Sequence, residues 1–123
     1  MRIFLADNQD RVRHAMRVLL AQQPGVEVVG EATTAGALVA HLRCNCPDLT
    51  MLDWELPGLA EAGGLPVLRR LCPSLKVVVL SSRPGTRQAA QAAGADGFVS
   101  KGDPPERLLA AVRRYSVTTR QEA

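Results

Sequence analysis

At 123 residues the chain is long enough for one domain with its own hydrophobic core, and 46% hydrophobic with 22% charged residues is a globular composition. No apolar run approaches the roughly 18 residues of a membrane span and no signal-peptide pattern begins the chain, so we expect a cytoplasmic protein without membrane contact. The net charge of +3 comes mostly from arginines spaced along the chain with few aromatics between them, which favours solvated helix faces over a nucleic-acid surface.

Short apolar runs alternate with helical patterns from one end of the chain to the other. In chain order we predict strand 2–6, helix 9–22, strand 26–32, helix 33–43, strand 49–52, helix 65–71, strand 77–80, helix 86–93 and strand 97–100. The last helix should begin at the segment DPPE, with Asp103 as N-cap, Pro104 in the first helical position and Glu106 in the third.

The predicted strands are continuously apolar rather than alternating, as expected of strands that are covered on both faces. Five strand–helix units of this length predict an α/β fold, (βα)5, with a doubly wound parallel five-stranded sheet and right-handed crossovers. We assign residues 1–116 to one domain and residues 117–123 to a polar C-terminal tail or the start of a linker.

Three cysteines, Cys44, Cys46 and Cys72, are an odd number in a chain without a secretion signal. We therefore expect reduced thiols rather than a disulfide framework. The segment from His41 to Cys46 has a faint likeness to a metal cluster, but it lacks the ligand spacing of zinc sites.

Polar side chains follow the predicted strands at the point where each one ends. Asp7 and Asn8 follow the first, Asp53 the third, Ser81 the fourth and Lys101 the fifth. Ligands of open parallel sheets bind at the carboxyl ends of the strands. If the strand order is 2-1-3-4-5, the first and third strands are neighbours and bring two of these carboxylates together.

Such a pair of carboxylates suits a small hard cation such as Mg²⁺, which also accepts phosphate oxygens. Asp53 could accept a phosphoryl group as an acyl phosphate, while Lys101 supplies positive charge and Ser81 a hydroxyl donor. Phosphoryl transfer depends mainly on positioning and charge neutralisation, so these few groups suffice. Taken singly, each of these residues could instead be a helix cap or a surface charge.

The segments FLADN, LTMLDWELPG, VVVLSS and GFVSK, in this order and spacing, resemble the receiver domain of two-component response regulators. The resemblance covers essentially the whole chain, and VEVVGEA, AAGADGFVSK and DPPERLLAAV are most similar to the LuxR/NarL-type transcription-factor branch. It implies a flavodoxin-like fold with strand order 2-1-3-4-5.

The resemblance also implies a role for each matching residue. Asp53 matches the phosphoacceptor that receives phosphate from a sensor histidine kinase, and Lys101 matches the lysine that neutralises the phosphoryl group. Ser81 and Phe98 match the hydroxyl and the aromatic side chain of the conformational switch. The metal ligands implied are Asp7, Asp53, the backbone carbonyl of Glu55 and, weakly or through water, Asn8.

Asn8 departs from the family, which normally has an acid at this position, so Mg²⁺ should bind more weakly here. As a good N-cap residue, Asn8 could also cap the first helix. One hypothesis is that the side chain of Glu55 restores the missing negative charge; a solvated loop glutamate is the simpler interpretation. The loop over 59–65 is longer than usual in the family, and a neutral insertion explains it best. Trp54 is expected to be partly buried.

The resulting function is a phosphoacceptor switch that controls an output, which we expect to be transcription, with at most self-catalysed phosphoryl transfer and autodephosphorylation as enzymatic activity. We expect nucleic acid to be reached only through an output domain absent from this chain, and homodimerisation is compatible with this reading. The alternative is a pseudo-receiver, weakened at the metal site by Asn8, that acts as a phosphorylation-independent interaction module. A flavodoxin-like electron carrier would need a glycine- and hydroxyl-rich loop after the first strand, where the chain reads ADNQDRVR.

Overall fold

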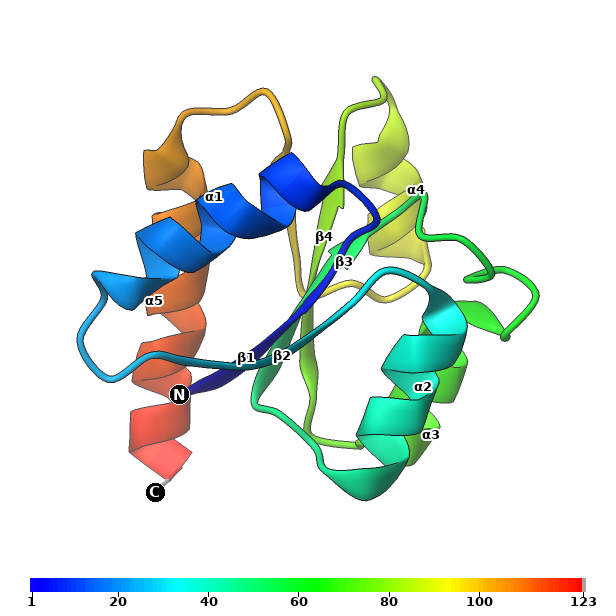
Figure 1. Ribbon diagram of the computed structural model, residues 1–123, viewed down its shortest axis with the longest axis horizontal. Coiled ribbons are helices and arrows are strands. Elements are labelled where there is room, and N and C mark those ends of the chain that lie inside the picture. Colours follow the sequence, from blue (N-terminus) through cyan, green and yellow to red (C-terminus); the bar gives the residue numbers. More distant parts are fainter. Residues whose placement is uncertain (123) are drawn as a thin grey trace.

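Five parallel strands form one sheet in the order β2-β1-β3-β4-β5, which confirms the predicted order (Figure 1). The computed structural model describes residues 1–122, with side chains described through residue 116. The strands are β1 Arg2–Ala6, β2 Glu27–Ala32, β3 Leu49–Asp53, β4 Lys76–Ser81 and β5 Gly97–Ser100. They alternate with α1 Asp10–Ala21, α2 Ala35–Cys44, α3 Gly64–Leu71, α4 Thr86–Ala92 and α5 Pro105–Glu122.

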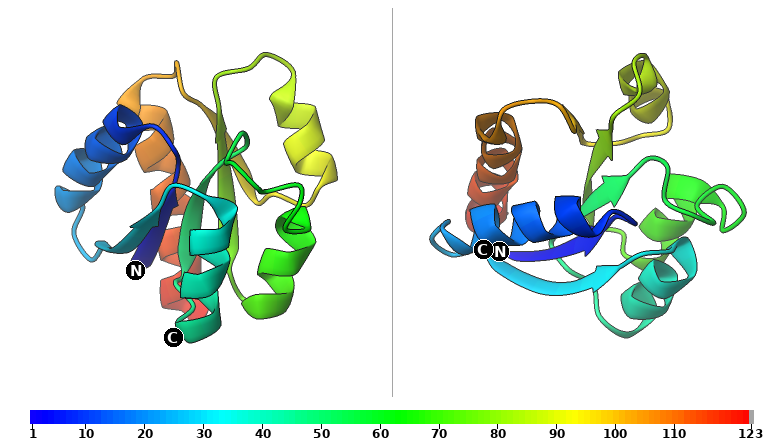
Figure 2. Two further views of the ribbon diagram at one scale, coloured as in Figure 1. Left: turned by 45° about the vertical axis from the view of Figure 1, so that its right-hand side comes forward. Right: turned by 45° about the horizontal axis from the view of Figure 1, so that its top comes forward.

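The helices form two layers, with α1 and α5 on one face of the sheet and α2, α3 and α4 on the other (Figures 1 and 2). Successive side chains of a strand point to opposite faces, so β1 sends Ile3 and Leu5 into the core beneath α1 and α5, and Phe4 into the opposite core. The central strand β3 is buried at every position, Leu49–Asp53. Burial on both faces accounts for the continuous apolar runs in the sequence.

The register of the sheet aligns the ends of its central strands. Ala6 of β1 pairs with Leu52 of β3, so Asp7 and Asp53, each one residue farther on, lie side by side. Ser81 of β4 pairs with Ser100 of β5, the residue before Lys101. The four predicted site residues therefore share one edge of the sheet.

Two predicted helix caps are wrong. The N-cap of α1 is Gln9, which makes no side-chain capping bond, so Asn8 is not the cap. Asp103 does not cap α5 either, because the helix begins at Pro105 and the Asp103 carboxylate accepts a hydrogen bond from Ser100 N at 3.1 Å. Both turns are closed by a carboxylate that bonds backbone outside the helix, a local alternative to capping.

The loop between β3 and α3 begins with Trp54, whose half-buried ring packs against the core beneath α2 and α3, as expected. The backbone N–H of Trp54 donates to Leu80 O in β4 at 2.8 Å. The loop ends at Gly63, whose φ of 105° is unfavourable for other residues and where a Cβ would lie 2.4 Å from Val67. The suggestion that residues 59–65 are a neutral insertion stays a prediction.

A disulfide joins Cys46 to Cys72, so the expectation of three reduced thiols is wrong for this pair. Cys46 precedes β3 and Cys72 precedes β4, and these strands are neighbours, which brings the two Cα atoms to 5.8 Å. Cys46 is exposed and Cys72 is buried, while Cys44 is a free and exposed thiol. The ring of His41 lies against Phe4, with 4.3 Å between the ring centroids. Among residues 1–116, whose side chains are described, there is no group of three or more potential metal-binding side chains, at His41 or elsewhere.

Helix α5 continues past residue 116, where we placed the domain boundary, to Glu122. The assignment of residues 117–123 to a tail or linker stays a prediction, and residue 123 lies outside the described residues. No helix within the described part of the chain is long and apolar enough to cross a membrane.

Candidate functional site

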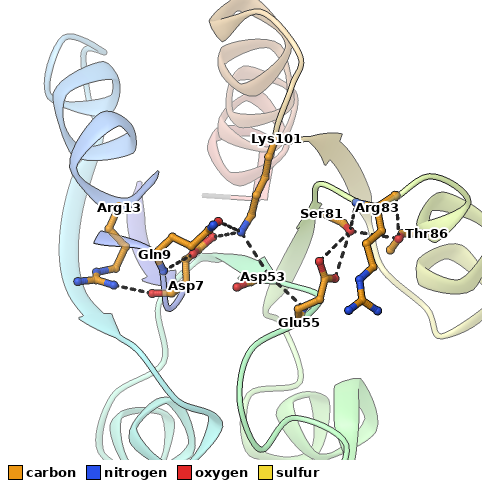
Figure 3. A network of polar contacts seen from close by, with 9 residues as sticks. All are labelled: Asp7, Gln9, Arg13, Asp53, Glu55, Ser81, Arg83, Thr86 and Lys101. Atoms are coloured by element: carbon orange, nitrogen blue, oxygen red, sulfur yellow. Dashed lines mark hydrogen bonds and ion pairs between the residues drawn. The ribbon is translucent and has the colours of Figure 1, made fainter. Parts of the chain in front are cut away.

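The four side chains that follow the strands meet at the carboxyl edge of the sheet (Figure 3). Asp7, Asp53 and Ser81 are at most 1% exposed, and the Lys101 side chain is 11% exposed. Parallel strands end at a common edge, so the topology alone brings these groups to one place. The structure thus gathers the residues selected from the sequence.

The ammonium group of Lys101 lies between the two carboxylates. Its Nζ atom is 2.9 Å from Asp7 Oδ2 and 3.4 Å from Asp53 Oδ1. It donates a hydrogen bond to Gln9 Oε1 at 2.7 Å, so three oxygen atoms lie around the ammonium group. One positive charge is shared by two buried carboxylates, and the pocket keeps a net negative charge.

Backbone hydrogen bonds hold each carboxylate in place. Asp7 Oδ1 accepts from Gln9 N at 2.8 Å, and Asp53 Oδ1 accepts from Glu55 N at 2.9 Å. The Arg13 guanidinium donates to Asp7 O at 2.7 Å and is itself held by Glu31, with Nε and Oε1 2.9 Å apart. These contacts fix the turns in which the strands end.

Burial raises the pKa of Asp7 above its ordinary value of 3.8, and the charge of Asp53 adds to this effect. The N–H of Gln9 and the ammonium of Lys101 act in the opposite direction without cancelling the effect of burial. A further positive charge beside Asp7 would therefore favour its ionised form.

Gln9, and not Asn8, contributes a side chain to the site. The side chain of Asn8 is exposed, whereas Gln9 contributes the amide oxygen that accepts from Lys101. Gln9 was missed because a glutamine just before a helix carries no recognisable signal of its own. Only the position of Lys101, on the loop after β5, reveals its partner.

A second cluster surrounds the hydroxyl of Ser81. Ser81 Oγ lies 3.1 Å from Glu55 Oε2, 3.3 Å from Glu55 Oε1 and 3.1 Å from Thr86 Oγ1, and it accepts from Arg83 N at 3.1 Å. Thr86 Oγ1 donates its own proton to Arg83 O at 3.0 Å. Glu55 is therefore not a freely solvated loop residue, and Thr86 is a second residue that sequence reasoning missed.

Phe98 lies outside both clusters. Its half-buried ring packs against the core beneath α2, α3 and α4, and the guanidinium carbon of Arg87 on α4 lies 5.0 Å from the ring centroid. Such a cation–π contact links β5 to α4 at the surface. The proposed switch role of Phe98 stays a prediction.

The donor set fits a hard cation in part. Asp7 and Asp53 present adjacent carboxylates, the ligands that Mg²⁺ prefers, but Lys101 lies between them and Asn8 is exposed. The side chains of residues 1–116 form no cluster of three acids, histidines or cysteines here. A cation at this place would have to displace the ammonium group of Lys101 or share the two carboxylates with it.

The arrangement is suited to accepting a phosphoryl group. A buried carboxylate is held next to an ammonium group that can neutralise charge on phosphoryl oxygens, and a hydroxyl lies across the pocket (Figure 3).

Comparison with known proteins gives one consistent result. The family described as the response regulator receiver domain matches residues 3–113. The response regulator UvrY of Escherichia coli is 32% identical over 116 residues, covering 90% of this chain and 52% of UvrY. The transcriptional regulatory protein DesR of Bacillus subtilis is 34% identical over 111 residues, covering 90% of this chain and 56% of DesR.

Among solved structures, a two-component response regulator of the LuxR family from Aurantimonas superposes with a TM-score of 0.79 at 32% identity. That match covers 92% of this chain and 82% of the solved one. The chain spans about half the length of the two regulators, UvrY and DesR.

Proposed function

The chain belongs to the receiver domain family of two-component response regulators, in its LuxR/NarL-type branch, and on this premise we propose that Asp53 accepts a phosphoryl group from a sensor histidine kinase. The observation that carries the proposal is the ammonium of Lys101, placed 3.4 Å from Asp53 Oδ1 and 2.9 Å from Asp7 Oδ2. A buried carboxylate beside a positively charged group is what an acyl-phosphate acceptor requires.

In the proposed reaction an oxygen of Asp53 attacks the phosphorus atom of a phosphohistidine. The new O–P bond forms as the P–N bond breaks, and the imidazole leaves with the electron pair of that bond. Lys101 stays within reach of the phosphoryl oxygens and neutralises part of their charge. Glu55 N–H, bonded to Asp53 Oδ1, keeps the carboxylate oriented for attack.

Receiver domains generally bind Mg²⁺, and here Asp7, Asp53 and the backbone carbonyl of Glu55 would hold it. When bound, Mg²⁺ neutralises charge on the transferring phosphoryl group. The raised pKa of Asp7 and the exposed amide of Asn8 both favour weak binding. Asp7 would nevertheless supply a fully buried oxygen ligand beside Asp53.

The family acts as signalling switches rather than as classical enzymes. We assign the switch in this chain to Ser81 and Phe98, and any enzymatic activity to self-catalysed phosphoryl transfer and autodephosphorylation. Transcription is the proposed output, since DesR is a transcriptional regulatory protein, and DNA would be contacted through a separate output domain. A cytoplasmic location and homodimerisation on phosphorylation belong to the same proposal.

The test is intact-mass measurement after incubation with acetyl phosphate and Mg²⁺. We expect a single added phosphoryl group, which Asp53→Asn abolishes and Lys101→Met strongly reduces. Glu27→Gln is the control, because Glu27 is exposed at the start of β2, at the opposite end of that strand from the site, and it should leave the adduct unchanged. An absence of any adduct at high donor concentration would refute the proposal and support a phosphorylation-independent interaction module.

A further inference from the structure

We propose that the Glu55 side chain is the resting-state acceptor of the Ser81 hydroxyl, so that a phosphoryl group on Asp53 must take Ser81 from it. The inference rests on the proposed function of Asp53 and extends it to the regulation of the same site. In Figure 3, Glu55 and Ser81 lie on one side of Asp53, while Lys101, Asp7 and Gln9 lie on the other.

The Ser81 hydroxyl has a single proton to donate. The hydroxyl accepts from Arg83 N, which leaves its own proton for Glu55 or Thr86, each with an oxygen at 3.1 Å. Thr86 uses its proton on Arg83 O and can accept only through a neutral oxygen. Hydrogen bonds to an ionised acceptor are about twice as strong as neutral ones, so the proton belongs to Glu55.

The backbone of Glu55 keeps the Glu55 side chain close to Asp53, the proposed phosphoacceptor. Glu55 N donates to Asp53 Oδ1 at 2.9 Å, so the side chain starts two residues from the site of phosphorylation and cannot lie far from it. No ion pair joins Glu55 to a cationic side chain within residues 1–116, and Lys101 is occupied by Asp7, Asp53 and Gln9. The Glu55 charge is thus not neutralised by a partner.

A phosphoryl group on Asp53 changes this balance in two ways. It replaces the single negative charge of the Asp53 carboxylate with about two on the phosphoryl group, and the neighbouring Glu55 carboxylate is repelled more strongly. It also offers Ser81 a more highly charged acceptor. The repelled side chain has space to move into, because Glu55 lines a hollow of about 490 Å³ together with Trp54, Leu59 and Glu61 of the following loop. Glu55 would therefore hold the Ser81 hydroxyl away from Asp53 before phosphorylation, and its side chain would move away once Asp53 is phosphorylated.

The experiment measures binding of beryllofluoride, a phosphoryl mimic, with Mg²⁺ present, by fluorine NMR. Glu55→Ala and Ser81→Ala are compared singly and together. If Glu55→Ala acts only by removing a negative charge, it should raise the affinity for beryllofluoride equally with and without Ser81. If it acts by removing a competing acceptor of the Ser81 proton, it should raise the affinity only when Ser81 is present. We expect Glu55→Ala to raise affinity by about tenfold more in the Ser81 protein than in Ser81→Ala, as suits a hydrogen bond to a charged group.

A second measurement follows the amide resonance of Arg83, whose N–H donates to Ser81 Oγ. Without beryllofluoride, Glu55→Ala should move this resonance toward its position in the beryllofluoride-bound wild type. Glu61→Ala is the matched control: it removes an exposed charge from the same loop and should leave the resonance in place.

Equal gains in affinity from Glu55→Ala in both backgrounds, or an unmoved Arg83 resonance, would overturn the inference while leaving phosphorylation of Asp53 intact. If neither the wild type nor any variant binds beryllofluoride, and acetyl phosphate gives no adduct, the proposed function itself fails and the inference fails with it.

Discussion

Replacing Cys46 by serine removes the disulfide to Cys72 with little other damage, because Cys46 is exposed and the change conserves its size. The bond closes a loop with a sequence separation of 26 residues. The chain-entropy relation for such a loop gives a loss of about 3.5 kcal/mol in the free energy of unfolding. With the average unfolding entropy per residue, a chain of 123 residues should lose about 14 °C in midpoint temperature.

The assay is thermal unfolding followed by circular dichroism, with and without a reducing dithiol. Reduction should lower the midpoint of the wild type to that of Cys46→Ser and should leave the variant unaffected. Cys44→Ser is the matched control, since Cys44 is free, exposed and two residues away, and its midpoint should stay at the wild-type value.

A midpoint for Cys46→Ser close to that of the oxidised wild type would refute the reasoning. So would three titratable thiols in the folded, non-reduced wild type, because the bond would then be absent in solution. A shift of the expected size that also appears in Cys44→Ser would assign the effect to the loop itself and not to the disulfide.

Three further predictions concern stability. Burial raises the pKa of Asp7 in the folded protein. Protonation of Asp7 therefore contributes its full stabilisation below about pH 3.8, and this contribution is lost as the pH rises through the folded-state pKa. Asp7→Asn should therefore raise the free energy of unfolding at pH 7, by a margin that shrinks on acidification in urea titrations. Arg69→Leu should cost about 2 kcal/mol in the same titrations, since the Arg69 guanidinium on α3 donates to one backbone carbonyl before β4 and to one carbonyl and one carboxylate before β5. A loss below about 0.5 kcal/mol would contradict this. Gly30→Ala should cost about 2 kcal/mol, because its Cβ would lie 2.7 Å from the buried ring of Phe4, whereas Gly36→Ala in α2 has room and should be neutral or stabilising; equal effects would refute the packing argument.

The sheet was predictable because its signal is carried by many residues at once. Every position of β3 is buried, and three of its five residues are Leu or Met, so the strand reads as a mainly apolar run. The meeting of Asp7, Asp53, Ser81 and Lys101 was also predictable, since it depends only on which residues follow the strands and on the strand order.

The partners of these side chains were not predictable in the same way. Gln9 and Thr86 enter the site through rotamers and turn geometry, which a single sequence does not encode visibly. Asn8 and Asp103 are strong N-cap types, yet the turns containing them are closed by other hydrogen bonds. A side chain at a helix start can cap the helix or bond to nearby backbone outside it, and these alternatives are similar in energy.

The disulfide was missed for a different reason. The sequence offered a count of three cysteines and no secretion signal, which are arguments about the environment of the chain and not about its geometry. The pairing follows from β3 and β4 being neighbours, because the loops that lead into them then start at the same edge. Strand adjacency was available as an expectation, and cysteine positions relative to the strand starts would have revealed the pair.

Trp54 gives the chain a built-in optical reporter. It is the single tryptophan of the sequence and follows Asp53 directly, and its backbone N–H donates to the carbonyl of Leu80, the residue before Ser81. A change in the turn after β3 or in the end of β4 should alter the surroundings of the indole ring. Its ultraviolet emission can therefore follow events at both residues in real time, in the unlabelled protein.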